Sequence, residues 1–577
     1  MEMSGVSAAA GVPEIKLEDP QEAVAEPEPW PLKREKPRRC RQALLVVGLV
    51  TLPLLLFLVL GQESAAAFWQ IATAKLTAMN GGRGFNDDDG AATGATTAAA
   101  NADELLGGLI APGMDRRSCR SRYDSWRYYK HFPYAPSPHL LRRLRAYEDR
   151  HRRCAPGTPL YAKAVDQLRS GRSAADLECN YVVWLPFDGL GNRMLSMVSG
   201  FLYALLTDRV FLAALPPDSD DLFCEPFPGA TWRLPADDFL HVAKLFGVGQ
   251  RPDRSYWSLV DKKEIAVPDD PAANATAAPP VPPAYVYLSL GWLLTDRIFF
   301  CGEHQVAIKK VNWLLQYSDL YYAPSLYAVA EFQDELRRLF PAKESVAHLL
   351  ARYLLHPSNS VWAIVTSYYR SNLAPAGRQI GVQIRMYGHS SIPADDMYKQ
   401  ILACSRQERI LPAAAESGGG GDGGNKNGTT TATAILIASL YADYYKRLRS
   451  RYAARGGAVG VFQPTHEERQ ATESLAHNRK ALAEIYLLSF SDELLTSGLS
   501  TFGYVAASLA GVRPAILLTA FDHKVPATPC RRAVSMEPCN LTPPRDVECR
   551  GKAVDKEDLA RHVRVCEDWE HGVKFFD

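Results

Sequence analysis

The sequence lacks an excess of either charge. Its 577 residues contain 65 Lys and Arg against 64 Asp and Glu, which gives a formal net charge of +1. A dedicated nucleic-acid-binding protein would show a basic excess, so this class is excluded and no nucleic acid is expected as a partner. The balance still allows a local basic cleft that binds one anionic small molecule.

The sequence also lacks the cysteine spacing of zinc sites. None of its 11 cysteines belongs to a Cys-x-x-Cys pair, so no zinc site is expected. Ten of them follow residue 61, and this even number indicates disulfides formed in an oxidising compartment. Their pairing does not follow from the spacing.

One long hydrophobic run lies near the N-terminus. Residues 43–61 contain no charged side chain, and as a helix they would extend about 28 Å, enough to span a bilayer. Lys and Arg residues stand directly before the run against one acidic residue, Glu35, which favours a cytosolic N-terminus. A cleaved signal peptide is the alternative, but the run starts late and is long for one. We expect a single-pass type II signal-anchor with the later residues in a lumen.

Composition divides the chain into segments. Residues 1–42 are rich in Pro and Glu and predict a disordered cytosolic tail, and residues 62–118 are rich in Ala, Gly and Thr and predict a flexible stem. The folded segments expected after the stem are an N-terminal lobe at 119–350, a C-terminal lobe at 351–529 and a Cys-rich segment at 530–577. A glycine-rich stretch predicts a disordered insert at about 412–430.

Short apolar runs alternate with helix-length segments after residue 179. Strands are expected at 181–186, 210–214, 380–386, 434–440 and 515–518, and helices at 193–206, 441–454 and 473–485. Short continuous apolar runs separated by helices indicate parallel sheets that are covered on both faces. The fold class is therefore α/β with two Rossmann-like lobes, and ligands of such sheets bind at the carboxyl ends of strands.

A glycine turn follows the first expected strand. Gly189 and Gly191 precede Asn192 and Arg193, where a helix is expected to begin. Glycines allow backbone N–H groups to approach an anion, and a helix N-terminus favours negative charge. The dinucleotide fingerprint requires a third glycine where Met194 stands, so a nicotinamide enzyme is a poor fit. Arg193 suits a diphosphate, with a surface salt bridge as the alternative.

Gln383 and Arg385 form a second candidate, at the end of the expected strand 380–386. An unpaired charge in a buried sheet is costly, so this arginine is expected to face a cleft. Its guanidinium could then bind phosphate through two hydrogen bonds. A structural ion pair with Asp395 or Asp396 is the alternative.

The third candidate is the run Ser500, Thr501, Phe502 and Gly503. Ser500 and Thr501 are typical N-cap residues, here of a helix expected to continue through Leu509. A bare cap is the default interpretation. A helix start at the carboxyl end of a strand is also where a nucleotide receives hydroxyl and N–H donors.

The sequence contains one weak metal-binding pattern and three sequons that permit N-glycosylation. Asp218 and Asp220 are spaced like a metal-binding DxD motif, but they lie in a turn flanked by prolines, which favours solvated turn carboxylates. No metal is therefore expected. Three sequons, at Asn274, Asn427 and Asn540, allow N-glycosylation.

Five separated blocks, in order, resemble the plant cell-wall fucosyltransferases of the xyloglucan α-1,2-fucosyltransferase type. They are YVVWLPFDGLGNRMLSMVSGFLYALLTDRVFL, DDLFCEPFPGATWRLP, GVQIRMY, TSGLSTFGYVAASLAG and MEPC with HVRVCEDW. The likeness extends from about Cys179 to the C-terminus. It implies a Golgi enzyme with a variant GT-B fold and the active site between its two lobes. Such an enzyme moves L-fucose from GDP-fucose to O2 of a galactose residue, with inversion and without a metal or other cofactor.

The resemblance also implies roles for the candidate residues. Arg385 would stabilise the departing diphosphate beside the turn from Gly189 to Arg193, and the run from Ser500 to Gly503 would hold the nucleotide. Gln383 stands where related fucosyltransferases often carry a histidine, so a polar contact is expected there.

Asp319 matches the proposed general base of the family. An inverting displacement must remove the proton of the acceptor hydroxyl, usually to a carboxylate. Asp188 and Asp492 are fallback candidates. The alternative is a transition state so dissociative that water accepts the proton.

The partners implied are GDP-fucose, a galactosylated polysaccharide or glycoprotein acceptor of xyloglucan or arabinogalactan type, and the Golgi membrane. A homodimer and assemblies with other Golgi glycosyltransferases stay open. A second function class stays open as well: a catalytically silent sugar-binding or complex-organising homologue of the same fold.

Overall fold

The computed structural model describes the folded body of the chain. The described residues are 103–235, 254–268, 280–386, 391–413, 432–453, 458–544, 547–549, 552–553 and 560–577. The expected tail, the anchor at 43–61, most of the stem and nearly all of the insert at 412–430 lie outside them, as do Asn274 and Asn427. Within the described ranges, no helix combines the length and the apolar character needed to cross a membrane.

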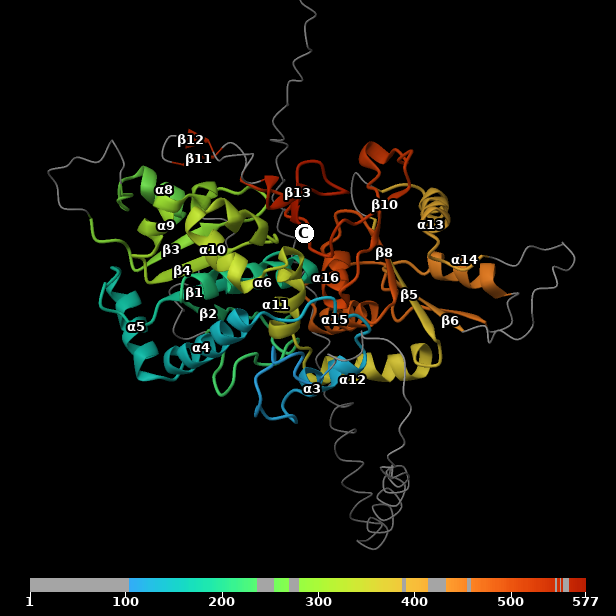
Figure 1. Ribbon diagram of the computed structural model, residues 1–577, viewed down its shortest axis with the longest axis horizontal. Coiled ribbons are helices and arrows are strands. Elements are labelled where there is room, and N and C mark those ends of the chain that lie inside the picture. The colour runs from blue at the N-terminus through green and yellow to red at the C-terminus, as the bar shows by residue number, and fades with distance from the viewer. Residues whose placement is uncertain are drawn as a thin grey trace, which may run out of the picture. The chain divides into compact units, whose positions relative to one another are not determined.

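A four-stranded parallel sheet organises the first part of the body (Figure 1). Its strands are β1 (Tyr181–Leu185), β2 (Val210–Ala213), β3 (Tyr285–Ser289) and β4 (Trp313–Tyr317), in the spatial order β2-β1-β4-β3. In β1, Val182 and Trp184 face the core that contains helix α6 (Leu190–Leu206), whereas Tyr181 and Val183 face a smaller cluster on the other side. Both faces are buried, which is why these strands are apolar throughout.

Helices and short turns surround the first sheet. They are α3 (Arg120–Asp124), η1 (Ser125–Arg127), α4 (Pro138–Cys154), α5 (Pro159–Ser170), α8 (Tyr256–Asp261), η4 (Arg297–Phe300), α9 (Gly302–Ile308), η5 (Ala323–Ala328), α10 (Ala330–Leu339), η6 (Lys343–Ser345) and α11 (Val346–Leu354). The start of α5 shows how local sequence sets these bounds. Thr158 accepts a hydrogen bond from the Tyr161 backbone, Pro159 follows, and Gly171 ends the helix at φ 77°.

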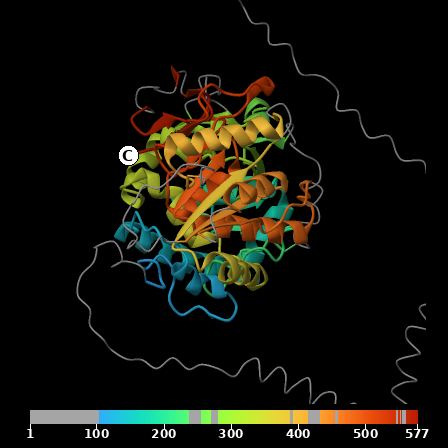
Figure 2. The same cartoon turned by 90° about the vertical axis from the view of Figure 1, so that its right-hand side faces the viewer.

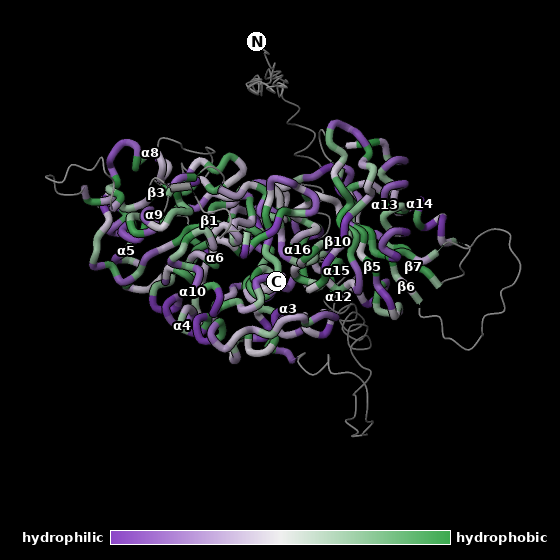
Figure 3. Tube along the Cα trace, turned by 45° about the horizontal axis from the view of Figure 1, so that its top comes forward, coloured by the Kyte–Doolittle hydropathy of each residue, from purple (hydrophilic) through white to green (hydrophobic). Residues whose placement is uncertain are grey.

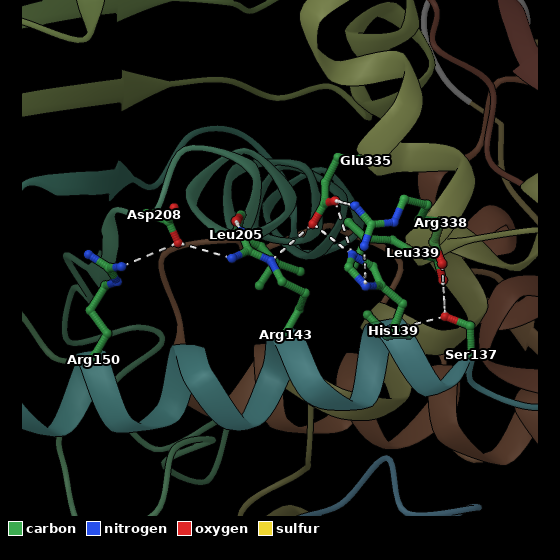
Figure 4. Close-up of polar contacts among 10 residues, drawn as sticks. Ser137, His139, Arg143, Arg150, Leu205, Asp208, Glu335, Arg338 and Leu339 are labelled. Carbon is green, nitrogen blue, oxygen red and sulfur yellow. Dashed lines mark hydrogen bonds and ion pairs between the residues drawn. The ribbon is translucent and has the colours of Figure 1, made fainter.

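Helix α4 is tied to two other helices by ion pairs (Figure 4). Arg143 lies 3.0 Å from Glu335 of α10 and 3.3 Å from Asp208, just after α6. Arg150, two turns further on, also contacts Asp208. Exposed pairs of this kind contribute little each, but together they fix the orientation of the arginine-rich face of α4.

A six-stranded sheet organises the second part of the body. Its strands are β5 (Arg378–Ile384), β6 (Thr433–Ser439), β7 (Val459–Phe462), β8 (Glu493–Ser497), β9 (Ala515–Leu517) and β10 (Cys530–Arg532), in the order β10-β9-β8-β5-β6-β7. All neighbours are parallel except β10, which pairs antiparallel with β9. Figure 3 shows β5 to β7 as predominantly apolar, as expected for strands covered on both faces.

Helices cover both faces of the second sheet (Figure 2). The helical elements after residue 355 are α12 (Asn359–Tyr368), the π-helical turn η7 (Tyr369–Leu373), α13 (Ala394–Glu408), α14 (Asp443–Tyr452), α15 (Leu475–Ser489), α16 (Thr501–Ala510) and η10 (Phe521–His523). In β6, Ile435 and Ile437 pack in the cluster that contains α13 and α14 residues, whereas Leu436 and Ala438 pack in the core that contains α15 and α16. Two short strand pairs follow, β11 (Glu548–Cys549) with β12 (Lys552–Ala553), and β13 (Val563–Val565) with β14 (Val573–Phe575).

The expected α/β class with parallel sheets is confirmed, with shifted bounds. All five expected strands are present, whereas β3, β4, β7 and β8 were not expected. Helix α6 begins at Leu190 rather than Arg193, because Gly189 is its N-cap. Gly191 therefore lies inside the helix, where a residue of low helix propensity must have another reason to be present.

The expected boundary between the lobes is wrong. It falls at 350/351, in the middle of α11, and one continuous core includes side chains from α6, α11 and α16. The boundary at 529/530 also fails, because β10 belongs to the second sheet. Sequence periodicity does not reveal where a core ends, because helices that join two sheets are apolar like any other buried helix.

The expected stem ends earlier than residue 118. Leu106, Leu109 and Ile110 are buried in the main core, and Arg145 of α4 donates a hydrogen bond to the carbonyl oxygen of Leu109 at 2.9 Å. A short apolar group within an Ala- and Gly-rich segment was enough to dock residues 103–118 on the folded body.

The ten cysteines after residue 61 form five disulfides, as expected. The pairs are Cys119–Cys224, Cys154–Cys179, Cys301–Cys549, Cys404–Cys530 and Cys539–Cys566. Cys539–Cys566 lies within the segment 530–577, and Cys301–Cys549 and Cys404–Cys530 link this segment to earlier parts of the chain.

The sequon at Asn540 lies in the interior of the folded body. Asn540 is completely buried, and its Nδ2 donates a hydrogen bond to Ser325 Oγ at 2.6 Å. A glycan on this nitrogen would have to displace the packing around it, which disfavours glycosylation at this position.

Candidate active site

A pocket with about 860 Å³ of empty space, open solvent included, lies at the carboxyl ends of β5 and β6, facing the start of α6. Residues from both parts of the body line it: Gly189, Leu190, Gly191, Gln383, Ile384, Arg385, Met386, Ala438, Ser439, Leu440, Tyr441, Thr465, Glu467, Gln470, Thr472, His477, Asn478, Lys480, Ala481, Glu484 and Phe502. Its position is the one expected for ligands of parallel sheets.

Arg385 is the first residue after β5 and lines the pocket. Its backbone N–H donates to Ser497 Oγ at 2.9 Å, which ties the end of β5 to the end of β8. Its guanidinium is partly exposed and donates to Gln470 Oε1 at 3.3 Å. Gly189 also lies against Gln470, so Arg385 and the glycine turn are neighbours in the pocket. Of the two acidic residues considered as alternative partners of Arg385, Asp395 pairs with Arg447 and Asp396 pairs with Lys399.

Gln383 is buried at the end of β5 and lines the pocket with Arg385. Its Oε1 accepts a hydrogen bond from the Ser497 backbone at 3.1 Å. Gly503 packs against it, because a Cβ on Gly503 would lie 3.0 Å from Gln383 Oε1. Through this contact Gln383 joins the ends of β5 and β8.

The starts of α6 and α16 touch each other beside the pocket. Thr501 Oγ1 donates a hydrogen bond to Asn192 Oδ1, which joins the first turns of the two helices. A Cβ on Gly191 would lie 2.7 Å from both the Phe502 backbone nitrogen and Thr501 Oγ1. Gly191 is therefore required for this close approach. The two helix N-termini direct N–H groups and partial positive charge toward the same region.

Replacing Gly191 by alanine is expected to destabilise the protein by about 1–3 kcal/mol or more, because the added methyl meets backbone atoms that cannot turn away. Chemical denaturation should show the loss, and GDP affinity should fall with it. Ala204→Gly, within the same helix, removes a buried methyl group and lowers helix propensity, so it should lower stability without lowering GDP affinity. A Gly191→Ala variant as stable as the parent would contradict the close approach.

Both helix starts follow residues with left-handed backbone. Asp188 has φ 59° and Leu499 has φ 54°, a backbone region that residues other than glycine rarely adopt. Asp188 accepts from Asn192 Nδ2 at 2.7 Å, and Leu499 donates its N–H to Asp568 Oδ2 at 2.8 Å. Strain of this kind persists where the surrounding structure determines it, and it collects at functional sites.

Four of the expected donor-binding residues, Asn192, Ser500, Thr501 and Gly503, do not line the pocket. Ser500 is fully buried as the N-cap of α16, and within the described residues its hydroxyl has no hydrogen-bond partner. Thr501 donates a hydrogen bond to Asn192, as described above, and Gly503 packs against Gln383. Phe502 does line it.

Arg193 does not face the pocket as a second cation. It is buried, and its guanidinium pairs with Asp218 at 2.8 Å and donates to Ser219 Oγ at 2.8 Å. Its Nε donates to the carbonyl oxygen of Asp188. The alternative of an ion pair is confirmed, with the difference that the pair is buried rather than on the surface. Arg193 fixes the strained turn from inside.

The acidic groups considered for a metal are occupied by other contacts. Asp218 pairs with Arg193, and Asp220 pairs with Arg233. Among the described residues, one group of three ligand-type side chains gathers closely, Cys301, Glu303 and Cys549. Its two cysteines form a disulfide and offer no thiolate.

Asp319 lies in the loop after β4, at the same edge of the first sheet as the glycine turn. Only 7% of its surface is exposed, and its Oδ1 accepts a hydrogen bond from the Trp292 backbone at 3.0 Å. Burial raises the pKa of Asp319 to about 6, with a smaller contribution from the nearby Asp188 carboxylate. A carboxyl group with such a pKa is suited to proton transfer near neutral pH. Asp319 does not line the 860 Å³ pocket itself.

The two fallback candidates for the general base lie at opposite ends of strands: Asp188 follows β1, and Asp492 precedes β8. Asp188 is exposed near Asp319. Asp492 precedes β8, at the amino end of its sheet, where it accepts from Lys130 Nζ at 2.7 Å and from the Gln379 backbone at 2.6 Å. The pocket is at the carboxyl end, so Asp492 as a base is wrong.

Sequence reasoning missed several polar residues of the pocket. Glu484 of α15 is almost wholly buried, and its Oε1 accepts from the backbone and the hydroxyl of Thr465 at 3.1 and 2.7 Å. Burial raises the pKa of Glu484 to about 8. Glu467 contacts His477 and Lys480 at the rim. A lone carboxylate in the apolar stretch ALAEIYLL was the available signal for Glu484.

The known proteins reported below that this chain resembles are fucosyltransferases. A family model described as Xyloglucan fucosyltransferase matches residues 75–550. The curated "Galactoside 2-alpha-L-fucosyltransferase" of Arabidopsis thaliana is 44% identical over 479 residues, 82% of this chain and 83% of that protein. The protein of the same name from Pisum sativum is 42% identical over 482 residues, 82% of each chain. A solved structure of an Arabidopsis thaliana FUT1 mutant in complex with GDP is 42% identical with a TM-score of 0.72, and covers 82% of this chain and 100% of that one.

Proposed function

Because the chain belongs to the xyloglucan fucosyltransferase family, we propose that it transfers L-fucose from GDP-fucose to O2 of a galactose residue on a cell-wall glycan. The observation that carries this proposal is the pocket at the carboxyl end of β5, with Arg385 at its wall. The relative solved with GDP supports the nucleotide part of the donor. The arrangement of two parallel sheets supports a variant GT-B fold with the active site between its lobes.

The donor side of the reaction needs positive charge. When fucose leaves, GDP becomes a diphosphate with additional negative charge, and preorganised donors stabilise it most effectively. Arg385 supplies a planar cation, and the facing starts of α6 and α16 supply helix N-termini. Arg193 contributes indirectly, since its pairing with Asp218 fixes the glycine turn.

The acceptor side needs a proton acceptor. We assign this role to Asp319, whose carboxylate would take the proton of the galactose 2-hydroxyl while O2 attacks the anomeric carbon of fucose. One displacement of this kind inverts that carbon. Asp319 must be ionised to act, and its pKa of about 6 meets that condition near neutral pH.

The test of the proposed function is GDP release from GDP-fucose by the purified lumenal body. Release should require a galactosylated acceptor, and an otherwise identical acceptor that carries 2-deoxygalactose should support none. Xyloglucan and arabinogalactan acceptors assayed side by side would identify the glycan. Absence of release with every acceptor, despite GDP binding, would favour the silent sugar-binding homologue.

The reaction is expected to proceed without a divalent metal. Asp218 and Asp220 are already paired with arginines, and Arg385 with two helix starts provides the charge that a metal would supply. Activity should be unchanged after EDTA treatment and on addition of Mn²⁺. Activity that disappears in EDTA and returns with Mn²⁺ would contradict this prediction.

The location follows from the sequence rather than from the described residues. We propose a single-pass type II protein of the Golgi membrane, anchored by residues 43–61, with the catalytic body in the lumen. Five disulfides in that body support an oxidising compartment. Homodimers and assemblies with other glycosyltransferases are compatible with this location.

A further inference from the structure

Three aromatic side chains from distant segments meet on the surface beside Asp319. Trp292 follows β3, Phe521 belongs to η10 after β9, and Trp569 lies between β13 and β14. The ring centroids of Trp292 and Trp569 are 6.1 Å apart, and those of Phe521 and Trp569 are 5.9 Å apart. We call these three residues the aromatic shelf. Trp292 is 49% exposed and Phe521 is 40% exposed.

The aromatic shelf adjoins the reacting groups on both sides. The backbone N–H of Trp292 donates to Asp319 Oδ1 at 3.0 Å, so the first ring is attached next to the proposed base. Asp568, directly before Trp569, accepts from the Leu499 backbone at the turn that begins α16. The aromatic shelf therefore lies between Asp319, the proposed base, and the start of α16 on the donor side.

The central ring of the shelf is held in place. Trp569 Nε1 donates to the carbonyl oxygen of Leu541 at 2.8 Å, and His571 packs edge-on against the indole at 5.0 Å. The disulfide Cys539–Cys566 anchors the chain shortly before Trp569. A ring fixed in this way loses little conformational entropy when a ligand covers it.

Large apolar side chains are normally withdrawn from water, so a cluster of exposed rings indicates a binding surface. Aromatic rings offer flat apolar faces with little conformational freedom, which suits the C–H faces of sugar rings. Two ring-to-ring steps in a row suit a ligand built of repeated cyclic units. Continuity with Asp319 favours the acceptor over an unrelated partner.

We propose that the aromatic shelf binds the sugar units of the acceptor glycan that flank the reacting galactose. It would thereby select polymeric acceptors over small galactosides. This inference rests on the proposed function, since the glycan is the acceptor of that reaction. The galactose itself is positioned at Asp319, and the shelf binds its neighbours.

The test compares two acceptors with one set of variants. Trp292→Ala keeps the backbone N–H that donates to Asp319. In this variant, the ratio of kcat/KM for a xyloglucan oligosaccharide to kcat/KM for a small galactoside should fall at least about tenfold. This is the scale of one or two aromatic contacts. Phe521→Ala should lower the same ratio without altering a neighbour of Asp319. Trp292→Phe should restore part of it. Melting temperature and GDP affinity confirm that each variant is folded.

Trp257 provides the matched control. It is a tryptophan on α8 with 46% exposure, and within the described chain it has no ring contact with the aromatic shelf. Trp257→Ala should leave the ratio unchanged. A ratio unchanged in folded Trp292→Ala and Phe521→Ala would overturn the shelf, and so would an equal loss with both acceptors. If the parent protein transfers to neither acceptor, the proposed function fails instead, which is a distinct result.

Discussion

Replacement of Arg385 by alanine is expected to remove nearly all fucosyl transfer, with a fall in kcat of about 10³–10⁵-fold, the scale of an arginine that stabilises a transferring phosphoryl group. Arg385 lies at the pocket wall, directly after β5, where the proposed reaction would develop diphosphate charge. Arg385→Lys should restore little, because an ammonium cannot present two parallel N–H donors. Steady-state kinetics and GDP binding measure both effects.

Arg378 is the matched control at the other end of the same strand. It pairs with Glu493 at the amino end of β5, away from the pocket. Arg378→Ala should lower stability slightly and leave kcat close to that of the parent protein. A folded Arg385→Ala protein with near-normal kcat/KM would remove Arg385 from the donor site.

Replacement of Asp319 by asparagine is expected to lower kcat by about 10²–10⁴-fold, the usual contribution of general-base catalysis. GDP affinity should be nearly unchanged, because Asp319 does not line the pocket proposed to bind GDP. Asparagine keeps the acceptor oxygen for the Trp292 N–H, so the loop should retain its geometry. A kcat within about threefold of the parent value, below that range, would favour water as the proton acceptor.

The pH dependence gives a second measurement on Asp319. Its pKa is raised from 3.8 to about 6, so the carboxylate becomes protonated as the pH falls through about 6. In the parent protein, kcat should fall about tenfold per pH unit below that value, and this limb should be absent in Asp319→Asn. Asp188→Asn should retain the limb, because the proposal assigns the base to Asp319.

The stability of Asp319→Asn separates catalysis from a structural role. A carboxyl group whose pKa is raised by folding stabilises the protein below its ordinary pKa, and this contribution is lost as the pH rises through about 6. At pH 7.5 the buried carboxylate is therefore unfavourable, and Asp319→Asn should raise the melting temperature. A lower melting temperature together with lower activity would indicate that Asp319 mainly supports its loop.

Much of the fold could be predicted because the buried strands are short apolar runs. The runs at 181–186 and 434–440 carry no competing signal, and both are strands. β8 begins with Glu493 and continues through Thr496, so its burial depends on its central place between β5 and β9 rather than on its composition. Tertiary context of this kind overrides local propensity.

The site could be predicted only where residues near in sequence stay near in space. Gly189 and Gly191 are two positions apart at the start of α6, and Arg385 directly follows β5, and the structure brings these residues to one pocket. The pairing of Arg193 with Asp218 joins residues 25 positions apart in different elements, and no local pattern distinguishes a paired arginine from one that faces a ligand. Glu484 and the aromatic shelf also depend on contacts between distant segments.

A core that continues beneath both sheets resists bending between them. Opening a hinge would expose buried side chains of α6, α11 and α16 to water and would separate the paired helix starts. Under the proposed function, exchange of spent GDP for fresh donor is therefore expected to proceed without a large movement of one sheet against the other.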